Sequence, residues 1–270
     1  MERENRRHGR GIWGLLTTCV LLALLVVGTQ IVRRDSGSED TPSQTLQRSN
    51  FSEEDFSFIQ GRMHYRGGAY RQGIDVSVHQ ENVDWQAVAE DGVDFAMIRA
   101  GYRGTTEGGL FRDEAFSQHL QGAQAVGLAT GAYFFSQATT VDEAIQEAEL
   151  MLDILDGSVM KYPVVYDWEM AAGGRTDGMD YETVTACCVA FCQRIEQAGY
   201  RAGVYFNLEM AKYLRLTELQ NYVLWLADYS ETPNFAYEFQ MWQYTESGKV
   251  SGIAGDVDLN LYFEPEKSAG

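Results

Sequence analysis

YPVVYDWE, residues 162–169, combines a buried strand with a pair of acids. Its first half is apolar on both faces, which is typical of a parallel strand covered by helices on one side and by packed side chains on the other. Its second half carries Asp167 and Glu169, whose side chains share one face because strand residues alternate, with Cα atoms about 6.6 Å apart. Two carboxylates on one face push their pKa values apart, which favours one proton donor and one anion.

Seven more β-rich runs flank this stretch, at 73–78, 95–102, 128–135, 201–206, 222–229, 238–244 and 256–263. Helical patterns separate the first five strands, at 85–92, 112–127, 141–155 and 181–199, and only 208–220 is helical after them. Alternating strands and helices over this length predict an α/β fold, a closed TIM-like parallel barrel. Because the later connections are short, we expect its closing third to be irregular.

Capping residues at the expected helix ends support two of these helices. Thr140 and Glu143 form a capping-box pattern before 141–155, and Asp180 and Gly199 bracket 181–199. Three of the four cysteines fall within the latter helix, too close together to staple a domain, so we expect them to be buried small apolar side chains.

The N-terminal region has the pattern of a membrane anchor. Residues 11–32 run for about 22 residues without a charge, against the ~20 that a helix needs to cross a bilayer. Residues 1–10 are rich in Arg, which predicts a cytoplasmic tail and a single-pass signal-anchor in the cell membrane, with the rest of the chain extracellular. A cleaved signal peptide is the alternative, but the apolar run is long and no A-x-A site closes it.

Composition divides the remainder of the chain. Residues 33–68, rich in Ser, Asp, Glu and Gln, are expected to be a disordered linker, 69–264 the barrel and 265–270 a tail. The formal net charge of −18 argues against nucleic acid as a partner, because phosphate binding needs clustered Lys and Arg. It also repels anionic polymers, so any such substrate must be held by short-range contacts.

Two further acids are expected beside the first pair. Asp75 ends the strand at 73–78, and Asp258 lies in the last strand, which closes the barrel next to the first. Catalytic side chains of such barrels gather at the carboxyl ends of the strands. Four acids converging there repel one another, a cost that favours a functional site over a solvated strand end.

These residues carry a resemblance to glycoside hydrolase family 25, the Chalaropsis-type lysozymes. The matching stretches are, in order, GIDVSVHQ, DFAMIRAGY, TGAYFFS, YPVVYDWE, GVYFN, WLADY, MWQYTESGKVSGIAG and VDLN, spread over about 72–263. The resemblance implies an irregular (β/α)5(β)3 barrel that cleaves the β-1,4 bond after N-acetylmuramic acid in the peptidoglycan glycan strand. It also implies that Asp75, Asp167, Glu169 and Asp258 form the catalytic group, with Glu169 resembling the general acid.

Aromatic residues near the strand ends fit a sugar site, because flat rings suit the apolar faces of pyranoses. Trp242 and Tyr244, two residues apart before the last loop, are the strongest candidates for substrate contact. The complete set of predicted substrate-binding residues is Tyr102, Tyr133, Tyr166, Tyr205, Trp242 and Tyr244.

The predicted reaction is hydrolysis in which Glu169 protonates the leaving oxygen and Asp167 stabilises the positive charge on the sugar. We expect Glu169 to be the only one of the four acids protonated at rest. Stereochemistry stays open between a substrate-assisted route and an inverting attack by water. A catalytically silent, membrane-tethered peptidoglycan-binding barrel is the main alternative, although it should have lost a central carboxylate. A metal-dependent amidase needs His and Asp ligands close together, a pattern the sequence does not show, so we predict no metal and no cofactor. The oligomeric state stays open.

Overall fold

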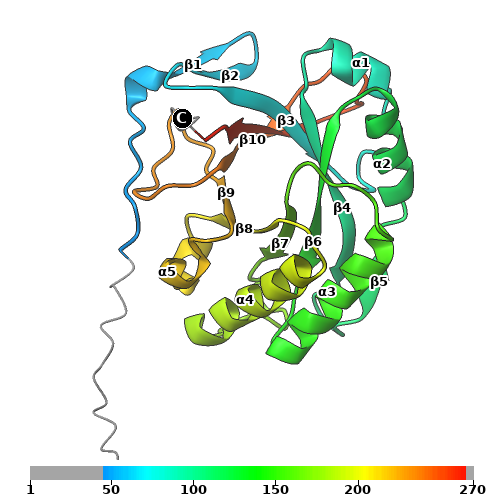
Figure 1. Cartoon of the computed structure of the whole chain (residues 1–270), viewed down its shortest axis with the longest axis vertical. Helices are drawn as coiled ribbons and strands as arrows, with labels where there is room; N and C mark the ends of the chain where they lie inside the picture. The colour runs from blue at the N-terminus through cyan, green and yellow to red at the C-terminus, as the bar shows by residue number, and fades with distance from the viewer. Residues whose placement is uncertain (1–44, 266–270) are drawn as a thin grey trace, which may run out of the picture. The chain divides into compact units, whose positions relative to one another are not determined.

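Residues 45–265 are described by a computed structural model (Figure 1). Eight of its strands close into a barrel, because the first barrel strand pairs with both the second and the last. In chain order these strands are β3 (Tyr70–Val76), β4 (Phe95–Arg103), β6 (Ala129–Ser136), β7 (Val164–Trp168), β8 (Ala202–Asn207), β9 (Val223–Ala227), β10 (Met241–Gly248) and β11 (Val257–Phe263). All eight predicted strands are therefore confirmed, and a short extra strand, β5 (Leu110–Arg112), pairs with the end of β4.

Strand direction explains how the last strand contributes to the site. Neighbours from β3 through β4, β6, β7, β8 and β9 to β10 run parallel, whereas β11 is antiparallel to both β10 and β3. The start of β11 therefore lies at the same mouth as the carboxyl ends of the other strands. Asp258 pairs directly with Asp75 across the β11–β3 ladder.

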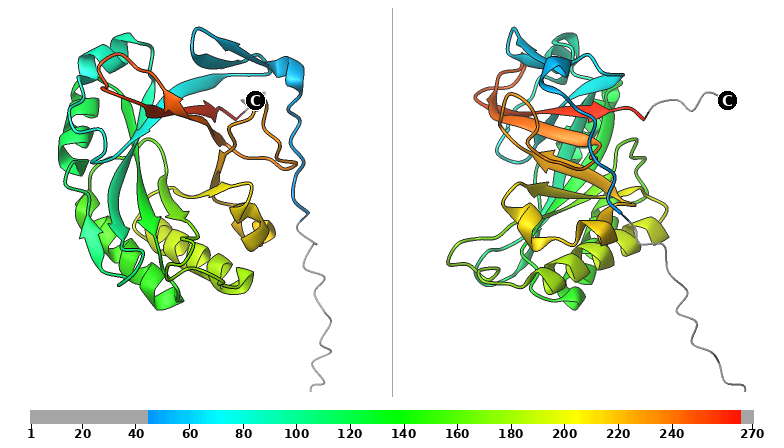
Figure 2. Two further views of the ribbon diagram at one scale, coloured as in Figure 1. Left: turned by 180° about the vertical axis from the view of Figure 1, so that it is seen from behind. Right: turned by 90° about the vertical axis from the view of Figure 1, so that its left-hand side faces the viewer.

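Helices cover one side of the barrel. They are α1 (Trp85–Glu90), α2 (Phe116–Ala125), α3 (Val141–Leu155), α4 (Tyr181–Gln197) and the short α5 (Leu216–Leu219), with 3₁₀ turns η1 (Glu53–Asp55) and η2 (Met210–Tyr213). Figure 2 shows α2 to α4 outside the green strands, while the orange and red strands β10 and β11 have no helix over them. The predicted irregular closing third is confirmed.

The predicted helix ends are confirmed in most details. Asp180 Oδ1 accepts from Thr183 N at 2.9 Å at the start of α4, and Thr140 Oγ1 accepts from Glu143 N at 3.2 Å at the start of α3. The capping box differs by one residue, because the Glu143 carboxylate accepts from the backbone of Thr139, not Thr140. The three cysteines of α4 are free and buried, as predicted.

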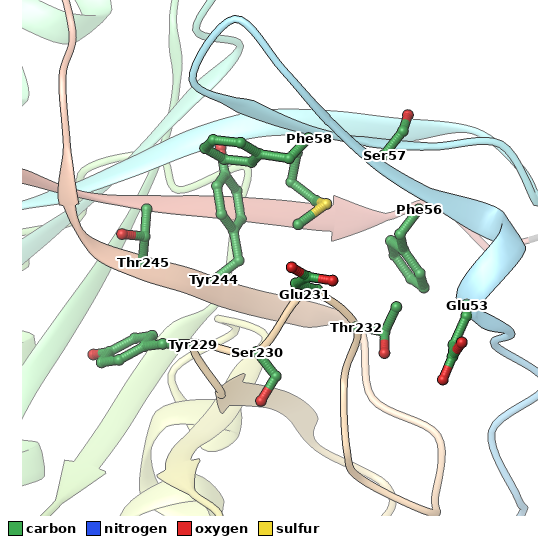
Figure 3. A pocket seen from close by; sticks show the side chains of 11 residues that line it. Glu53, Phe56, Ser57, Phe58, Tyr229, Ser230, Glu231, Thr232, Tyr244 and Thr245 are labelled. Atoms are coloured by element: carbon green, nitrogen blue, oxygen red, sulfur yellow. The ribbon is translucent and has the colours of Figure 1, made fainter.

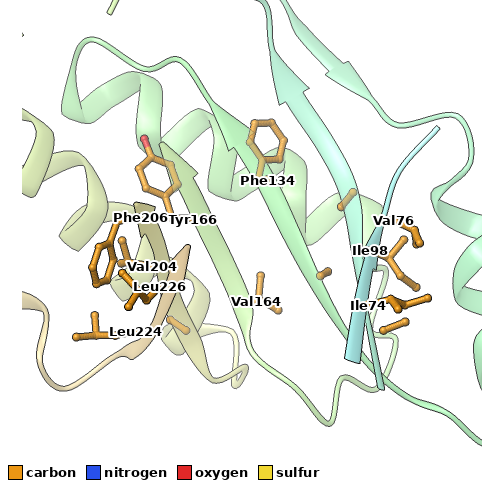
Figure 4. Close-up of a cluster of buried hydrophobic side chains, with 14 of the residues drawn as sticks. Ile74, Val76, Ile98, Phe134, Val164, Tyr166, Val204, Phe206, Leu224 and Leu226 are labelled. Atoms are coloured by element: carbon orange, nitrogen blue, oxygen red, sulfur yellow. The ribbon is translucent and has the colours of Figure 1, made fainter. Parts of the chain in front are cut away.

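The strands separate two cores. An inner cluster inside the barrel includes Phe95, Val165, Trp225 and Met241. An outer cluster fills the space between the strands and the elements around them, and Figure 4 shows part of it. Because side chains alternate along each strand, every barrel strand except β3 contributes apolar residues to both cores.

The prediction of a disordered linker over 33–68 is wrong for its second half. β1 (Phe56–Ile59) and β2 (Arg62–Tyr65) form an antiparallel hairpin. Its two-residue turn, Gln60 and Gly61, has φ values of 50° and 81°, the left-handed conformation that tight hairpins require. The polar composition of this region concealed a strand pattern with a glycine turn.

Aromatic side chains attach this hairpin to the barrel. The Phe56 ring lies 5.2 Å from Trp242 and the Phe51 ring 4.6 Å from Phe263, measured between ring centroids. Burial of these rings removes a large apolar area from water, which explains why a segment with many charges is ordered here. The hairpin covers the side of the barrel that has no helix (Figure 2).

The predicted cytoplasmic tail, transmembrane segment and first part of the linker lie outside the described residues, as do residues 266–270. Within residues 45–265, no helix has both the length and the apolar character needed to span a bilayer.

Candidate active site

The four predicted acids meet in one cavity of about 250 Å³ at the carboxyl end of the barrel. The sequence placed them on three strands, and the structure brings all of them to this mouth. The residues that line the cavity are Asp75, Arg99, Tyr133, Phe135, Asp167, Glu169, Tyr205, Trp225, Tyr229, Gln243, Glu246 and Asp258.

Two amides hold Asp75. Its Oδ2 accepts from Asn260 Nδ2 at 2.7 Å and from Gln243 Nε2 at 3.0 Å. The amide oxygens accept in turn: Asn260 Oδ1 from Trp225 Nε1 at 2.9 Å, and Gln243 Oε1 from the Tyr205 hydroxyl at 3.1 Å. Since each amide donates at one end and accepts at the other, the network fixes both amide orientations and presents two donors to Asp75.

Asp75 and Asp258 face each other across the β11–β3 ladder and shift each other's pKa. Burial raises the pKa of Asp75, while hydrogen bonds from Asn260, Gln243 and Asp258 oppose that rise. Burial, the Asp75 charge and the hydrogen bond to Asp75 raise the pKa of Asp258 to about 9. Asp258 therefore holds the proton at neutral pH and donates it to Asp75. The expectation that Glu169 alone is protonated is wrong, because the antiparallel pairing places Asp258 directly opposite Asp75.

Asp167 is buried on the inner face of β7. Its pKa is raised well above the usual value, first by burial and then by the charges of Glu169 and Asp75, while Arg99 opposes the rise. Its Oδ1 is buried and has no hydrogen-bond partner among residues 45–265. A buried carboxylate oxygen without a donor is costly, so this atom is suited to accept a hydrogen bond from a ligand.

Glu169 follows β7 and is only partly buried. Burial raises its pKa, as expected of an acid that must keep a proton near neutral pH. Its backbone carbonyl accepts from Gln137 Nε2 at 2.6 Å and from Thr176 Oγ1 at 3.2 Å. These bonds fix the end of β7 and so help to define where the carboxyl group lies.

Arg99 is the only basic side chain among the described residues that line the cavity. Its Nε donates to Asp113 Oδ2 at 2.7 Å, and Asp113 also accepts from the backbone of Val78 and Ala115. The guanidinium is thus held in place on the inner face of β4. It supplies one positive charge opposite several acids, which favours the anionic form of Asp167.

Two of the predicted substrate-binding aromatics lie where they were expected. Tyr133 on β6 and Tyr205 on β8 both line the cavity. Burial raises the pKa of both hydroxyls well above the ordinary value, so each remains a neutral donor.

The other four aromatics do not line this cavity. Tyr166 is fully buried in the outer core (Figure 4), with its ring 4.6 Å from Phe191 of α4. Trp242 is fully buried too, and its Nε1 donates to the carbonyl of Asp228 at 2.7 Å. The predictions of Tyr166 and Trp242 as substrate contacts are therefore wrong, because neighbours of an inward residue must face outward.

Tyr244 and Tyr102 also lie outside the cavity with the acids. Tyr244 is on the outer face of β10, beneath the hairpin, and lines a different cavity. Tyr102 follows a register shift in β4 and stacks on Phe111, at 5.1 Å between ring centroids. Tyr244 is therefore not positioned to touch a sugar held by the four acids. The Tyr102 ring lies 5.4 Å from the guanidinium of Arg99, which lines the cavity, so its contact with substrate stays a prediction.

Sequence reasoning missed several polar side chains of the site. Gln243 lies between the two predicted aromatics of β10, and Asn260 is two residues beyond Asp258. Alternation along the strand predicts both positions, once Asp258 and Met241 are taken as inward. Arg99 shares the inner face of β4 with Phe95 and Met97 in the same way. In the described part of the chain, no group of three or more His, Cys, Asp or Glu has metal-binding geometry.

A closed α/β barrel with paired carboxylates at the carboxyl mouth and aromatic rings around them has the architecture of a glycoside hydrolase. The family model for glycosyl hydrolases family 25 matches residues 74–253. The chain belongs to this family.

Individual relatives agree with this assignment. The autolytic lysozyme of Clostridium acetobutylicum is 28% identical over 194 residues, covering 72% of this chain and 56% of that protein. The crystal structure of the CTP1L endolysin is 30% identical with a TM-score of 0.61, covering 73% of this chain and 67% of that one. The modular autolysin LytC from Streptococcus pneumoniae, solved with a synthetic peptidoglycan ligand, has a TM-score of 0.64 at 23% identity, which shows the shared fold. That match covers 77% of this chain and 52% of LytC, so this chain spans about half the length of the lysozyme and of LytC.

Proposed function

We propose that this protein is a peptidoglycan hydrolase, a lysozyme that cleaves the β-1,4 bond after N-acetylmuramic acid. The observation that carries the proposal is the meeting of Asp75, Asp167, Glu169 and Asp258 in one cavity with aromatic walls. Membership of family 25 and the similarity to the clostridial lysozyme and to the CTP1L endolysin support it.

In the proposed mechanism Glu169 donates a proton to the leaving oxygen. Burial raises its pKa, which favours the protonated form, and its partial exposure at the mouth lets it reach the scissile bond. Asp167 lies deeper in the cavity, where the charge of Arg99 opposes the rise in its pKa, and in its anionic form it stabilises the positive charge that develops on the sugar. Asp75 and its protonated neighbour Asp258 supply further polar contacts at the floor of the site.

Asp167 Oδ1 favours a substrate-assisted route. The 2-acetamido group of the sugar carries one N–H, which can donate to the buried oxygen that has no partner in the described protein. This bond would orient the acetamido oxygen as internal nucleophile and give retention of configuration. The alternative, inversion by attack of water across a wider gap between the carboxyl groups, gives the opposite anomer. Proton NMR of the first product separates the two routes.

The decisive experiment is digestion of purified peptidoglycan by the full chain, followed by identification of the new reducing end. N-Acetylmuramic acid is expected there. N-Acetylglucosamine would replace the lysozyme proposal with a glucosaminidase, and no new reducing end would support a catalytically silent binding barrel. The presence of all four carboxylates argues against the silent barrel.

We also propose that residues 11–32 anchor the enzyme in the cell membrane, with the barrel outside. The length of the uncharged run and the Arg-rich residues before it support this topology. Protease added to intact cells should remove the barrel and leave a protected N-terminal fragment. Protection of the whole chain would contradict the outward orientation, and a soluble form beginning near residue 30 would show cleavage of a signal peptide.

A further inference from the structure

A second cavity, of about 710 Å³, lies beside the cavity that holds the acids. Figure 3 shows that three segments of the chain surround it: the hairpin β1–β2, the loop after β9 and the outer face of β10. The hairpin contributes Phe56 and Phe58, the loop contributes 229–232, and β10 contributes Tyr244 and Thr245. The hairpin lies outside residues 74–253, so this wall is an addition to the part of the chain that matches the family.

The hairpin wall is held rigidly against the barrel. In addition to the Phe56–Trp242 ring contact, Arg62 Nη1 donates to the carbonyl of Lys249 at 2.8 Å. Gln72 Nε2 donates to the carbonyl of Met63 at 2.6 Å. These bonds join the second strand of the hairpin to β3 and to the segment after β10. A ligand meets a wall that is already in place, which lowers the entropic cost of binding.

Tyr229 connects the two cavities. It lines both of them, and 51% of its surface is exposed. Its hydroxyl donates to Gln243 Oε1 at 2.9 Å, and Gln243 in turn donates to Asp75. The surface is therefore continuous from the acids, across the Tyr229 ring, to the hairpin.

The chemistry of the second cavity fits a neutral carbohydrate. Phe58 presents a ring that is 62% exposed and free to pack against a ligand. Hydroxyls of Ser230, Thr232 and Thr245 and carboxylates of Glu53 and Glu231 complete the lining. These groups accept hydrogen bonds from sugar hydroxyls. Because no basic side chain lines this cavity among the described residues, an anionic ligand would be repelled.

We propose that this cavity is an additional sugar subsite, which binds a neutral N-acetylglucosamine residue of the glycan strand beyond the residues on either side of the cleaved bond. The proposal rests on the proposed lysozyme function, since the strand in the catalytic cavity continues across Tyr229 onto Phe58. A ring such as Phe58 packs against the apolar face of a pyranose, while the carboxylates and hydroxyls bind its edge.

Phe58→Ala tests the subsite, and Ile59→Ala is its matched control. Ile59 is on the same hairpin, is 49% exposed, and lines a cavity on the other side of the hairpin. The substrate is a set of glycan strands from which the stem peptides have been removed, in short and long forms. For Phe58→Ala we expect KM on long strands to rise about tenfold, with kcat and the KM for a tetrasaccharide unchanged. Ile59→Ala should match the wild type on both.

Equal KM values for Phe58→Ala and Ile59→Ala on long strands would overturn the subsite. A Phe58→Ala defect that appears on intact peptidoglycan but vanishes on peptide-free strands would overturn it too, by assigning the cavity to the stem peptide. Binding of long peptide-free strands is also measured by calorimetry in full-length Glu169→Gln protein, where turnover should be about 10² to 10⁴-fold slower. There Phe58→Ala should weaken the Kd about tenfold. If the wild type showed no turnover but Phe58→Ala still weakened binding, the proposed reaction would be rejected and the subsite would stand.

Discussion

The two faces of the barrel strands differ in kind, although they alternate residue by residue. On β7, Asp167 faces the interior and lies among charged and polar groups, whereas Tyr166 faces α4 and packs in an apolar core. On β10, Gln243 faces inward and donates to Asp75, whereas Trp242 is buried on the outside beneath the hairpin. Position along the strand determines which residues reach the substrate, and residue type does not.

The interior face also differs in how it is stabilised. Near the mouth, its polar side chains form one hydrogen-bond network, which joins Trp225, Asn260, Asp75, Gln243 and Tyr205. The outer face is stabilised mainly by apolar burial between strands and helices, together with one buried polar network of Ser136, Tyr166, Glu147 and Arg103. Substitutions on the inner face should therefore change catalysis, and substitutions of their outward neighbours should change stability.

The largest contrast is expected between Asp167→Asn and Tyr166→Phe. Asp167→Asn removes the charge that stabilises the transition state, so kcat should fall about 10² to 10³-fold with little change in stability. Tyr166→Phe keeps the ring against Phe191 and removes one buried hydroxyl, so kcat should be unchanged and stability should fall by about 1 kcal/mol. Steady-state kinetics and urea unfolding of both variants measure this contrast. A kcat loss in Tyr166→Phe comparable to that of Asp167→Asn would contradict the division between faces.

The adjacent pair on β10 gives a second test. Gln243→Leu removes a donor to Asp75 and the acceptor of Tyr205 and Tyr229, and we expect kcat/KM to fall about tenfold, as one buried hydrogen bond to a charge implies. Trp242→Phe loses the bond to the Asp228 carbonyl and part of the packing, and should cost about 1 to 3 kcal/mol of stability with kcat/KM per folded molecule retained. The reverse pattern would mean that Trp242 reaches the substrate.

A smaller effect is expected for the Asp75–Asp258 pair. The folded state holds the proton of Asp258 up to a pKa of about 9, while the unfolded chain releases it near about 3.9. Between these values the folded state binds more protons, so this contribution to stability is full at low pH and is lost as pH rises through 9.

Asp258→Asn keeps a donor to Asp75 and removes the titrating proton. Its free energy of unfolding should fall less between pH 5 and 9 than that of the wild type, by at least about 1 kcal/mol, which one pKa unit represents. Urea unfolding at both pH values gives this difference. Identical pH dependence in the two proteins would show that Asp258 is ionised when folded.

The barrel itself could be predicted from hydrophobic periodicity and from capping residues at the helix ends, because each strand and each long helix has a strong local pattern. The hairpin could not, because its order depends on distant partners such as Trp242 and Phe263, which composition does not reveal. In the site, the four acids followed from strand ends and from the family resemblance. Tyr166 and Trp242 were assigned by residue type, although the inward side of Asp167 already required Tyr166 to face outward.

The proton distribution among the acids was also beyond the sequence. It depends on the antiparallel pairing of Asp258 with Asp75 and on two amides, Gln243 and Asn260, brought from β10 and β11. Only the closed barrel places these groups in contact.

The central claim is that Glu169 is the general acid, and the most direct test is Glu169→Gln measured on two substrates. The substitution keeps the shape and removes the transferable proton. On peptidoglycan, kcat should fall about 10² to 10⁴-fold. On an aryl glycoside whose leaving group needs little protonation, the loss should shrink to about tenfold or less, because departure no longer depends on the acid. An equally severe loss on both substrates would contradict the claim and reassign the proton donor to another of the four carboxyl groups.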